Sequence, residues 1–398
     1  MKFLRFLPVT ALALLLTLNL HGHDEIKKIP IVYCPEYNIS LLGSTFIARL
    51  TSPVIEKVIN KIHPFDGKKY GKIVSYFSKK NIFSPEQCYA SNKASHEDLL
   101  LVHSRGYLES LSSPAVIAKA FDLGPFIAQL PNPLARATKS LLQNIIEPMR
   151  YATGGTVLTA QLAMQYGWAI NLSGGYHHAK PNKAEGGCFF ADIPLAIKKL
   201  RLSLNKPDLN VLIVDLDAHR GNGLAMYVQN DPHTFLFDMY NNNVYPGNID
   251  NTEQYITFNN PLDGGNFYHR KLSDQEYMFT LTTQLPEALE LLEKNKTKPD
   301  LIIFNAGTDP YKNDPLGCMN ISKNGILKRD EYVCSLAMKH AIPIALTLSG
   351  GYAHDNVDVI CSSFENLLLH VFHIETVDVK RANKAPHFFK KFLHKKAL

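Results

Sequence analysis

The segment at residues 211–223 constrains the fold more than any other part of the chain. It opens with four apolar residues, three of them β-branched, and continues with Asp215, Asp217 and His219, after which two glycines follow. A short apolar run of this kind is typical of a strand that is buried on both faces, as in a parallel sheet. Because ligands of open α/β sheets bind just beyond the carboxyl ends of the strands, the segment predicts a polar site at one edge of such a sheet.

A metal ion is the first candidate ligand for this segment. Asp217 and His219 are two residues apart, so on an extended chain their side chains point to the same side. A carboxylate oxygen and an imidazole nitrogen together suit a first-row metal, and zinc above all. Asp215 is a candidate third ligand or a residue that orients a ligand. The alternative is an aspartate turn that caps the next helix, and this short motif alone does not decide between the two.

Three further segments, at 168–178, 301–309 and 342–352, repeat the pattern of an apolar run that ends in polar, glycine-rich sequence. If all four runs are parallel strands, one rim of the sheet collects a set of polar side chains: His177, His178, Asp217, His219, Asp309 and Tyr352. Three metal ligands leave one coordination position for water and substrate, as in catalytic zinc sites. We therefore predict an α/β protein with one domain, in which helices cover both faces of a mainly parallel sheet.

The order of these motifs resembles that of the zinc-dependent histone deacetylases, and within that family it is most similar to class IV. The resemblance extends from about residue 29 to about residue 372 and includes the motifs at 30–33, 63–66, 153–156, 174–178, 215–223, 305–309 and 349–352. It implies the arginase/deacetylase fold. It also implies a hydrolase that removes acetyl or longer fatty acyl groups from lysine side chains of a protein or peptide.

The resemblance implies a role for each polar residue at the rim. Zinc is implied to bind three ligands, Asp217, His219 and Asp309. The implied catalytic residues are His177, His178 and Tyr352. In that scheme the histidine pair transfers protons, and the tyrosine donates a hydrogen bond to the developing oxyanion.

Each histidine of the pair has an orienting partner in the family pattern. The matching residues here are Asp215 for His177 and Asn222 for His178. A carboxylate stabilises an imidazolium far more than an amide does. We therefore expect the pKa of His177 to be higher than the pKa of His178.

The resemblance also implies a structural monovalent cation, usually K⁺, which is bound partly by backbone carbonyls. The residues that match this site are Asp215, Asp217, His219, Asp238 and Met239. Asp238 comes at the end of the strand-like run at 234–237, and its alternative role is that of an ordinary turn aspartate.

One position in the implied substrate channel departs from the family pattern. The family usually has Gly-Phe-Cys where this chain has Gly-Gly-Cys at 186–188, and that Phe forms one wall of the acyl-lysine channel. Tyr245 matches the opposite wall. The resemblance thus implies that Gly186, Gly187 and Tyr245 contact the substrate.

The glycine at 187 leaves two expectations open. Either Phe189 or Phe190 fills the space of the missing ring, or the channel is wide. A Phe side chain buries about 150–250 Å², so a wide channel would hold an acetyl group loosely. It would favour a long acyl chain, because each buried methylene contributes about 0.8 kcal/mol.

Three other functions are compatible with parts of this pattern. A deacetylase of small acylated amines, such as polyamines, would use the same chemistry on another substrate. A two-metal, arginase-like hydrolase shares the fold, but the residues that follow His219 and Asp309 lack the extra carboxylates it needs. A non-catalytic protein that binds acyl-lysine would not need His177, His178 and Tyr352, so their presence favours an enzyme.

The N-terminus carries a separate signal. Residues 1–23 contain Lys2 and Arg5 and an apolar stretch that is shorter than a membrane span, which predicts a signal peptide. We therefore expect an exported protein, either secreted or periplasmic, with a catalytic domain at 24–373. The alternative is a protein that is membrane-anchored by an uncleaved N-terminus.

The positive charge of the chain is concentrated at its ends. The formal net charge is +6, and residues 374–398 alone hold seven Lys or Arg against two acidic residues. This basic tail suits contact with an acidic partner or a membrane surface. The remaining core is close to neutral, so we expect no direct binding of nucleic acid by the core.

Overall fold

The computed structural model describes residues 26–39, 66–121, 143–247 and 251–374. The predicted signal peptide at 1–23 lies outside the described residues, and so does the basic tail beyond residue 374. Of the motif at 63–66, only Asp66 is described.

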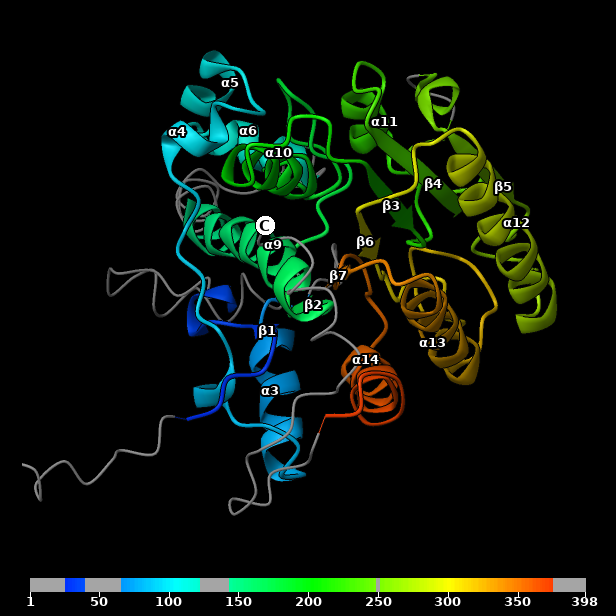
Figure 1. The fold of residues 1–398 in the computed structure, drawn as a ribbon. Helices are drawn as coiled ribbons and strands as arrows, with labels where there is room; N and C mark the ends of the chain where they lie inside the picture. The colour runs from blue at the N-terminus through cyan, green and yellow to red at the C-terminus, as the bar shows by residue number, and fades with distance from the viewer. Residues whose placement is uncertain (1–25, 40–65, 122–142, 248–250, 375–398) are drawn as a thin grey trace, which may run out of the picture.

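The described residues form one parallel sheet of seven strands in the order β1-β2-β7-β6-β3-β4-β5 (Figure 1). The strands are β1 Ile31–Val32, β2 Trp168–Asn171, β3 Val211–Asp215, β4 Thr234–Asn241, β5 Phe258–Leu262, β6 Leu301–Asn305 and β7 Ile344–Thr347. The four apolar runs of the sequence become β2, β7, β6 and β3, which are neighbours in the middle of the sheet. The predicted parallel α/β fold is confirmed.

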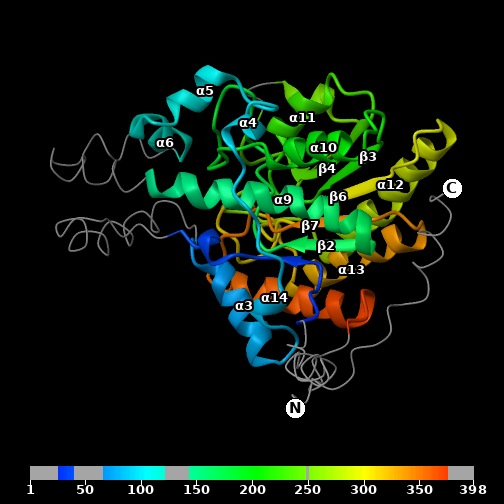
Figure 2. The same ribbon diagram turned by 60° about the vertical axis from the view of Figure 1, so that its left-hand side comes forward.

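Helices cover both faces of the sheet, as predicted (Figure 2). One face carries α9 (Ile146–Tyr166) and α10 (Asp192–Ser203), and the other carries α3 (Lys69–Lys79), α12 (Asp274–Lys294), α13 (Lys323–Lys339) and α14 (Asn356–Asn366). Shorter helices are α4 His96–Leu99, α5 Arg105–Ser110, α6 Pro114–Ala120 and α11 Asn222–Val228. Single turns of other helix types are η1 Pro35–Tyr37, η2 Pro85–Gln87, η3 Gln143–Ile145, η4 Thr252–Tyr255 and η5 Leu367–Val371. None of the described helices combines the length and the apolar character that a membrane span requires.

The strand register brings polar residues into a row at the carboxyl edge of the sheet. All residues of β2, β3, β6 and β7 are buried, because helices pack on both faces. Asp215 lies opposite Asn305, and Asn305 lies opposite Thr347, which in turn lies opposite Asn171. The Asn305 Nδ2 atom donates a hydrogen bond to Asp215 Oδ1 over 3.0 Å, and Thr347 Oγ1 donates to Asn305 Oδ1 over 2.9 Å. The loops that follow these strands therefore begin at the same level.

The fourth strand is longer than the sequence indicated. β4 runs to Asn241, so Asp238 lies inside the strand and pairs in register with Asp215. The strand-like run at 234–237 thus continues beyond Asp238, and the alternative of a turn aspartate is wrong. The apolar pattern stops at Asp238 because this side chain faces the buried polar site, while the backbone remains paired with β3 and β5.

A buried arginine ties α13 to the ends of two strands. The side chain of Arg329 is fully buried, and its Nη1 donates to the carbonyl oxygens of Leu216, over 3.1 Å, and Gly307, over 2.6 Å. Its Nε donates to Asp330 Oδ1 over 2.8 Å, and Asp330 Oδ2 accepts a hydrogen bond from Ser363. Leu216 and Gly307 follow β3 and β6, so this network fixes the loops that continue from both strands.

Replacement of Arg329 by Met tests this network. The variant leaves the buried Asp330 carboxylate without its cation, so we expect a loss of about 3–5 kcal/mol in the free energy of unfolding. Lys323→Met is the matched control, because it breaks the exposed ion pair with Asp358 and should cost at most about 1 kcal/mol. Denaturant unfolding of both variants measures the difference, and equal losses would contradict the role given to Arg329.

Candidate active site

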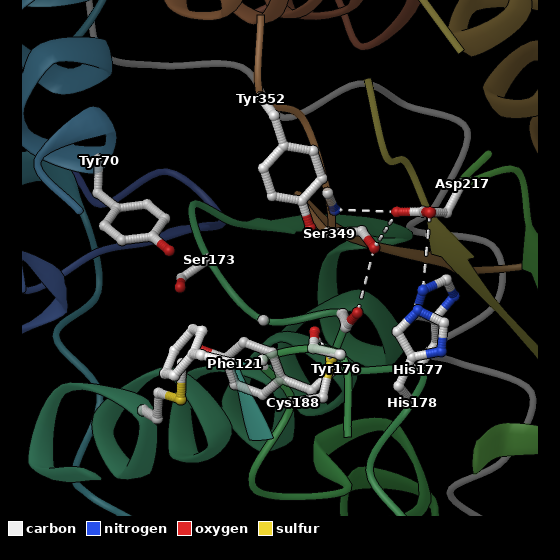
Figure 3. A pocket seen from close by; sticks show the side chains of 16 residues that line it. Tyr70, Phe121, Ser173, Tyr176, His177, His178, Cys188, Asp217, Ser349 and Tyr352 are labelled. Atoms are coloured by element: carbon white, nitrogen blue, oxygen red, sulfur yellow. Dashed lines mark hydrogen bonds and ion pairs between the residues drawn. The ribbon is translucent and has the colours of Figure 1, made fainter. Parts of the chain in front are cut away.

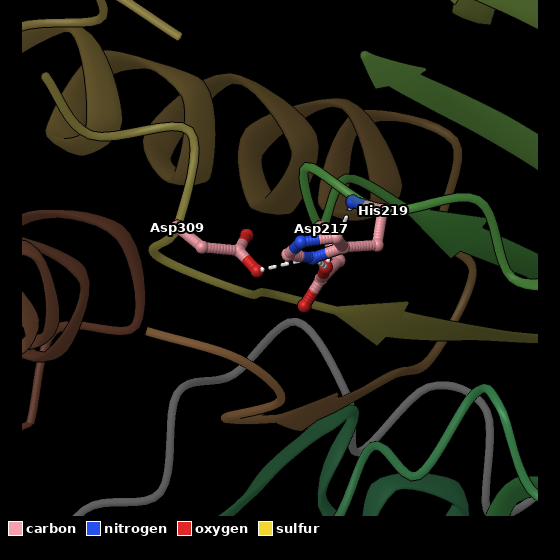
Figure 4. Close-up of side chains that lie close together, drawn as sticks. All are labelled: Asp217, His219 and Asp309. Atoms are coloured by element: carbon pink, nitrogen blue, oxygen red, sulfur yellow. Dashed lines mark hydrogen bonds and ion pairs between the residues drawn. The ribbon is translucent and has the colours of Figure 1, made fainter. Parts of the chain in front are cut away.

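Three of the predicted metal ligands meet beyond the carboxyl ends of β3 and β6 (Figure 4). His219 Nδ1 lies 2.9 Å from Asp217 Oδ1 and 2.9 Å from Asp309 Oδ2. All three side chains are buried, and their ligand atoms lie within 4.8 Å of one another. A single ring N–H cannot serve both carboxylates fully, whereas a metal ion can bind all three atoms.

The charge around this cluster also fits a bound cation. The carboxylates of Asp215, Asp217, Asp238 and Asp309 are all buried. Burial, and after it the negative charge of Asp217, raises the pKa of Asp309 to about 7. Burial and the charge of Asp215 likewise raise the pKa of Asp238 well above its usual range. A divalent cation would relieve this repulsion, so the donor set and the electrostatics agree.

The two histidines that follow β2 each contact the partner that the sequence suggested. His177 Nδ1 lies 2.8 Å from Asp215 Oδ2, and His178 Nδ1 lies 2.8 Å from Asn222 Oδ1. The two rings are adjacent, with their centroids 4.0 Å apart. Asp215 ends β3 and Asn222 begins α11, so the same segment orients both histidines.

The two partners give the histidines opposite protonation preferences. Burial alone would lower the pKa of His177, but the carboxylates of Asp215 and Asp217 outweigh burial and raise it to about 9. Burial and the positive charge of His177 lower the pKa of His178 well below its usual range. Because Asn222 Oδ1 accepts a hydrogen bond from His178 Nδ1, the lone pair of the neutral ring lies on Nε2. His178 is therefore the member of the pair that can accept a proton.

Tyr352 reaches the same pocket from the loop that follows β7. It lines the pocket together with His177, His178 and Asp217, and Figure 3 shows its ring pointing into the pocket. The backbone N–H of Tyr352 donates to Asp314 Oδ2 over 2.6 Å, which holds the loop in place. Burial, and then the charge of Asp217, raises the pKa of Tyr352 well above its usual range, so its hydroxyl stays protonated.

A second group of buried oxygens lies behind the metal ligands. Asp238 Oδ2 accepts a hydrogen bond from the Gly221 N–H over 2.9 Å, while Asp238 Oδ1 is buried without a hydrogen-bond partner in the described part of the chain. Asp215 and Asp238 are paired across β3 and β4, and the next residue of β4, Met239, is also buried. An unpartnered buried carboxylate oxygen fits a cation at this position.

A family model covers most of the chain. The histone deacetylase domain matches residues 63–368. The chain belongs to the histone deacetylase family. Histone deacetylase 2 of Arabidopsis thaliana is 36% identical over 362 residues, which are 89% of this chain and 82% of the plant protein.

This histone deacetylase family member also resembles more distant proteins, one in sequence and one in fold. Histone deacetylase 1 of Homo sapiens is 27% identical over 286 residues, which are 69% of this chain and 54% of the human protein. This chain therefore matches about half of that relative's length. The crystal structure of the HDA15 HD domain has a TM-score of 0.62 and 18% sequence identity, over 88% of this chain and 91% of that domain. At this identity the likeness shows the deacetylase fold alone.

The implied substrate residues of this family member surround the histidines. Gly186 and Gly187 line the pocket. The ring of Tyr245 meets the ring of His178 edge-on, with centroids 5.0 Å apart. A side chain at Gly186 would place its Cβ only 2.4 Å from the His178 ring. A glycine is therefore required for the loop to pass this histidine.

Neither of the two phenylalanines considered for the missing wall takes that place. Phe189 and Phe190 are fully buried in the core, and the pocket does not include them. The ring beside Gly187 is that of Phe121, which follows α6 and lines the pocket. The space beside Gly187 is therefore occupied by a ring from another segment of the chain. Sequence analysis missed Phe121, because no local pattern links residues so far apart.

Two more residues that sequence analysis missed position the site. Asp192, the first residue of α10, accepts hydrogen bonds from the backbone N–H groups of Gly175 and Tyr176, over 2.8 and 2.9 Å. Ser349 Oγ lies 2.9 Å from Asp217 Oδ2 and 3.1 Å from the Gly175 carbonyl oxygen. An acidic residue at a helix start usually indicates only a cap, and a serine beside two glycines usually indicates only a turn.

Ser349 has a positive φ of 49°, which is uncommon for a residue other than glycine. Its hydroxyl contacts a predicted metal ligand, so we expect Ser349→Ala to lower the affinity for Zn²⁺ by about 10–100-fold. Competition with a chelator measures this affinity. Ser91→Ala is the matched control, because its buried hydroxyl donates to the Tyr151 carbonyl oxygen, away from the metal ligands. An unchanged affinity in Ser349→Ala would show that the contact does not orient Asp217.

Proposed function

We propose that this chain is a zinc-dependent hydrolase that removes acetyl or longer acyl groups from lysine side chains of proteins. Family membership supports hydrolysis of the deacetylase type. The observation that supports the proposal most is the cluster of Asp217, His219 and Asp309, which adjoins a pocket lined by the histidine pair and Tyr352.

The donor set supports zinc as the metal. Two carboxylates and one imidazole are typical zinc ligands, and three protein ligands leave a position open for catalysis. Zinc, when bound there, supplies a Lewis acid that polarises the amide carbonyl of the substrate and activates water. Hydrogen bonds hold the two carboxylate ligands in place: Ser349 Oγ and the Gly350 N–H donate to Asp217, and the Ala218 N–H donates to Asp309.

The protein's own residues handle the protons and the developing charge. His178 Nε2 accepts a proton from water as the carbonyl carbon is attacked, and the lysine amine takes a proton as it leaves. His177 stays protonated and supplies positive charge beside the reaction. The Tyr352 hydroxyl donates a hydrogen bond to the oxyanion of the substrate.

We also propose a structural K⁺ ion behind the zinc ligands. The unpartnered Asp238 Oδ1 and its neighbour Asp215 support this site. Its other ligands would be backbone carbonyls of Asp217, His219 and Met239. The ion would offset the buried negative charge without taking part in the chemistry.

Assignment to class IV and the identity of the substrate are further parts of the proposal. A panel of acyl-lysine peptides and acetylated polyamines, offered to the zinc-loaded protein, separates a protein deacylase from a deacetylase of small amines. Hydrolysis of the peptides supports the first. Hydrolysis of the polyamines alone supports the second, and binding without hydrolysis supports a reader of acyl-lysine.

The metal content tests the proposal most directly. We expect about one zinc ion per chain, because the three ligands form one catalytic site. Asp309→Ala should lose the metal, since it removes one of only three protein ligands. Elemental analysis of the purified protein measures both. Two tightly bound manganese ions per chain would instead indicate an arginase-like enzyme.

The role of Tyr352 is tested by its replacement with Phe. Loss of one oxyanion donor should lower kcat by about 10²–10³-fold and leave the zinc content unchanged. Tyr76→Phe is the matched control, because its hydroxyl donates to Glu365 on the opposite side of the sheet from α9. Steady-state kinetics on an acetyl-lysine peptide measures the effect. An effect below about threefold would mean that Tyr352 only packs in the pocket and that another group stabilises the oxyanion.

A further inference from the structure

The loop at Gly186 and Gly187 contributes backbone but no side chain to the pocket. Gly187 has a φ of 72°, a conformation that L residues rarely adopt. Its N–H donates a hydrogen bond to the Ala120 carbonyl oxygen over 2.9 Å. A Cβ at Gly187 would lie 3.1 Å from the Phe121 ring. The end of α6 is thus fixed against the glycine loop, and the glycine leaves room for the neighbouring ring.

Phe121 is held between the core and the pocket. Its ring packs against Phe189 with centroids 5.5 Å apart, and only 8% of the residue is exposed. Its other side lines the pocket, where Figure 3 shows it beside Cys188 and Tyr176 and across from Tyr352. A ring that is packed on one side in this way has little freedom to move aside.

We propose that Phe121 sets the length of the acyl group that the pocket accepts. This inference rests on the proposed function. The pocket beside the histidine pair has a volume of about 50 Å³. Pockets for larger ligands measure about 300–1,000 Å³, so the space that the described residues leave here suits a short acyl group better than a fatty chain. The ring that limits the space follows α6 and takes the place of the family's ring at residue 187.

This proposal is opposite to the expectation that Gly187 makes the channel wide and favours a long acyl chain. With Phe121 in place, the enzyme prefers acetyl-lysine to a long acyl-lysine. Removing the ring opens the pocket towards the buried apolar cluster to which Phe121 belongs, together with Ile117, Ile145, Met149 and Phe189. These side chains are apolar and suit an alkyl chain.

The test compares Phe121→Ala and Phe121→Leu with the wild type, as zinc-loaded full-length proteins. The substrates are acetyl-lysine and myristoyl-lysine in the same peptide. We expect the ratio of kcat/KM for myristoyl over acetyl to rise at least about tenfold in Phe121→Ala, and less in Phe121→Leu. A change of one methylene in an apolar pocket already shifts such ratios about 10–200-fold. Gly187→Phe is unsuitable, because a side chain there would strain the backbone and press on the Phe121 ring.

Phe190→Leu is the matched control. Phe190 belongs to the same buried cluster but does not line the pocket. It should lower thermal stability and leave the ratio unchanged. An equal change of the ratio in Phe190→Leu would indicate general loosening of the cluster, and an unchanged ratio in both Phe121 variants would indicate another wall. Either result overturns the proposal. If circular dichroism shows that Phe121→Ala does not fold, Phe121→Leu decides alone.

A binding measurement separates this inference from the proposed function. Alkyl hydroxamates with two and fourteen carbons are offered to the zinc-loaded proteins, and calorimetry gives both affinities. Loss of the ring should improve binding of the long hydroxamate relative to the short one by at least about tenfold. A wild type that binds both probes but hydrolyses no acyl-lysine peptide would contradict the proposed function. The affinity ratio would still test Phe121 as the wall.

Discussion

The buried carboxylates within β4 and at or just beyond the carboxyl ends of β3 and β6 are the constraint on which the rest of the site depends. Asp215, Asp217, Asp238 and Asp309 are at most 1% exposed, and so many like charges are unfavourable in a protein interior. His177 offsets part of this charge, which is why its pKa rises to about 9 despite burial. Cations at the Asp217 cluster and near Asp238 would offset the rest. The buried negative charge thus accounts both for the need for bound cations and for the protonation of His177.

Hydrogen bonds from buried polar side chains hold the loops of the site, because these loops lie beyond the paired strands. Parallel strands end at the rim, and the backbone groups beyond it need other partners. Asp192 binds the loop that precedes the histidines, Arg329 binds the loops after β3 and β6, and Asp314 binds the backbone of Tyr352. Each of these three residues is buried. The proposed catalytic side chains therefore stand on loops that buried hydrogen bonds hold in place.

The pocket contains an aromatic ring beside Gly187 that comes from a distant part of the sequence. A glycine at 187 removes a side chain from the loop beside His178, and the Phe121 ring occupies the adjoining space. The same glycine lets the loop adopt a positive φ and bond to Ala120. Under the proposal for Phe121, substrate selection depends on how α6 packs, and α6 belongs to a different buried cluster from the sheet. The residue at position 187 alone therefore does not predict the shape of this pocket.

The sequence by itself determined the central strands, their parallel arrangement and the set of polar residues at the rim. These follow from short-range patterns, because an apolar run marks a buried strand and the residues after it must lie at the sheet edge. It also indicated the partners Asp215 and Asn222, through the resemblance. Tertiary structure alone decided the extent of β4 around Asp238, the wall formed by Phe121 and the support from Arg329. Each of these depends on contacts between distant segments, and local periodicity does not encode which distant side chain fills a given space.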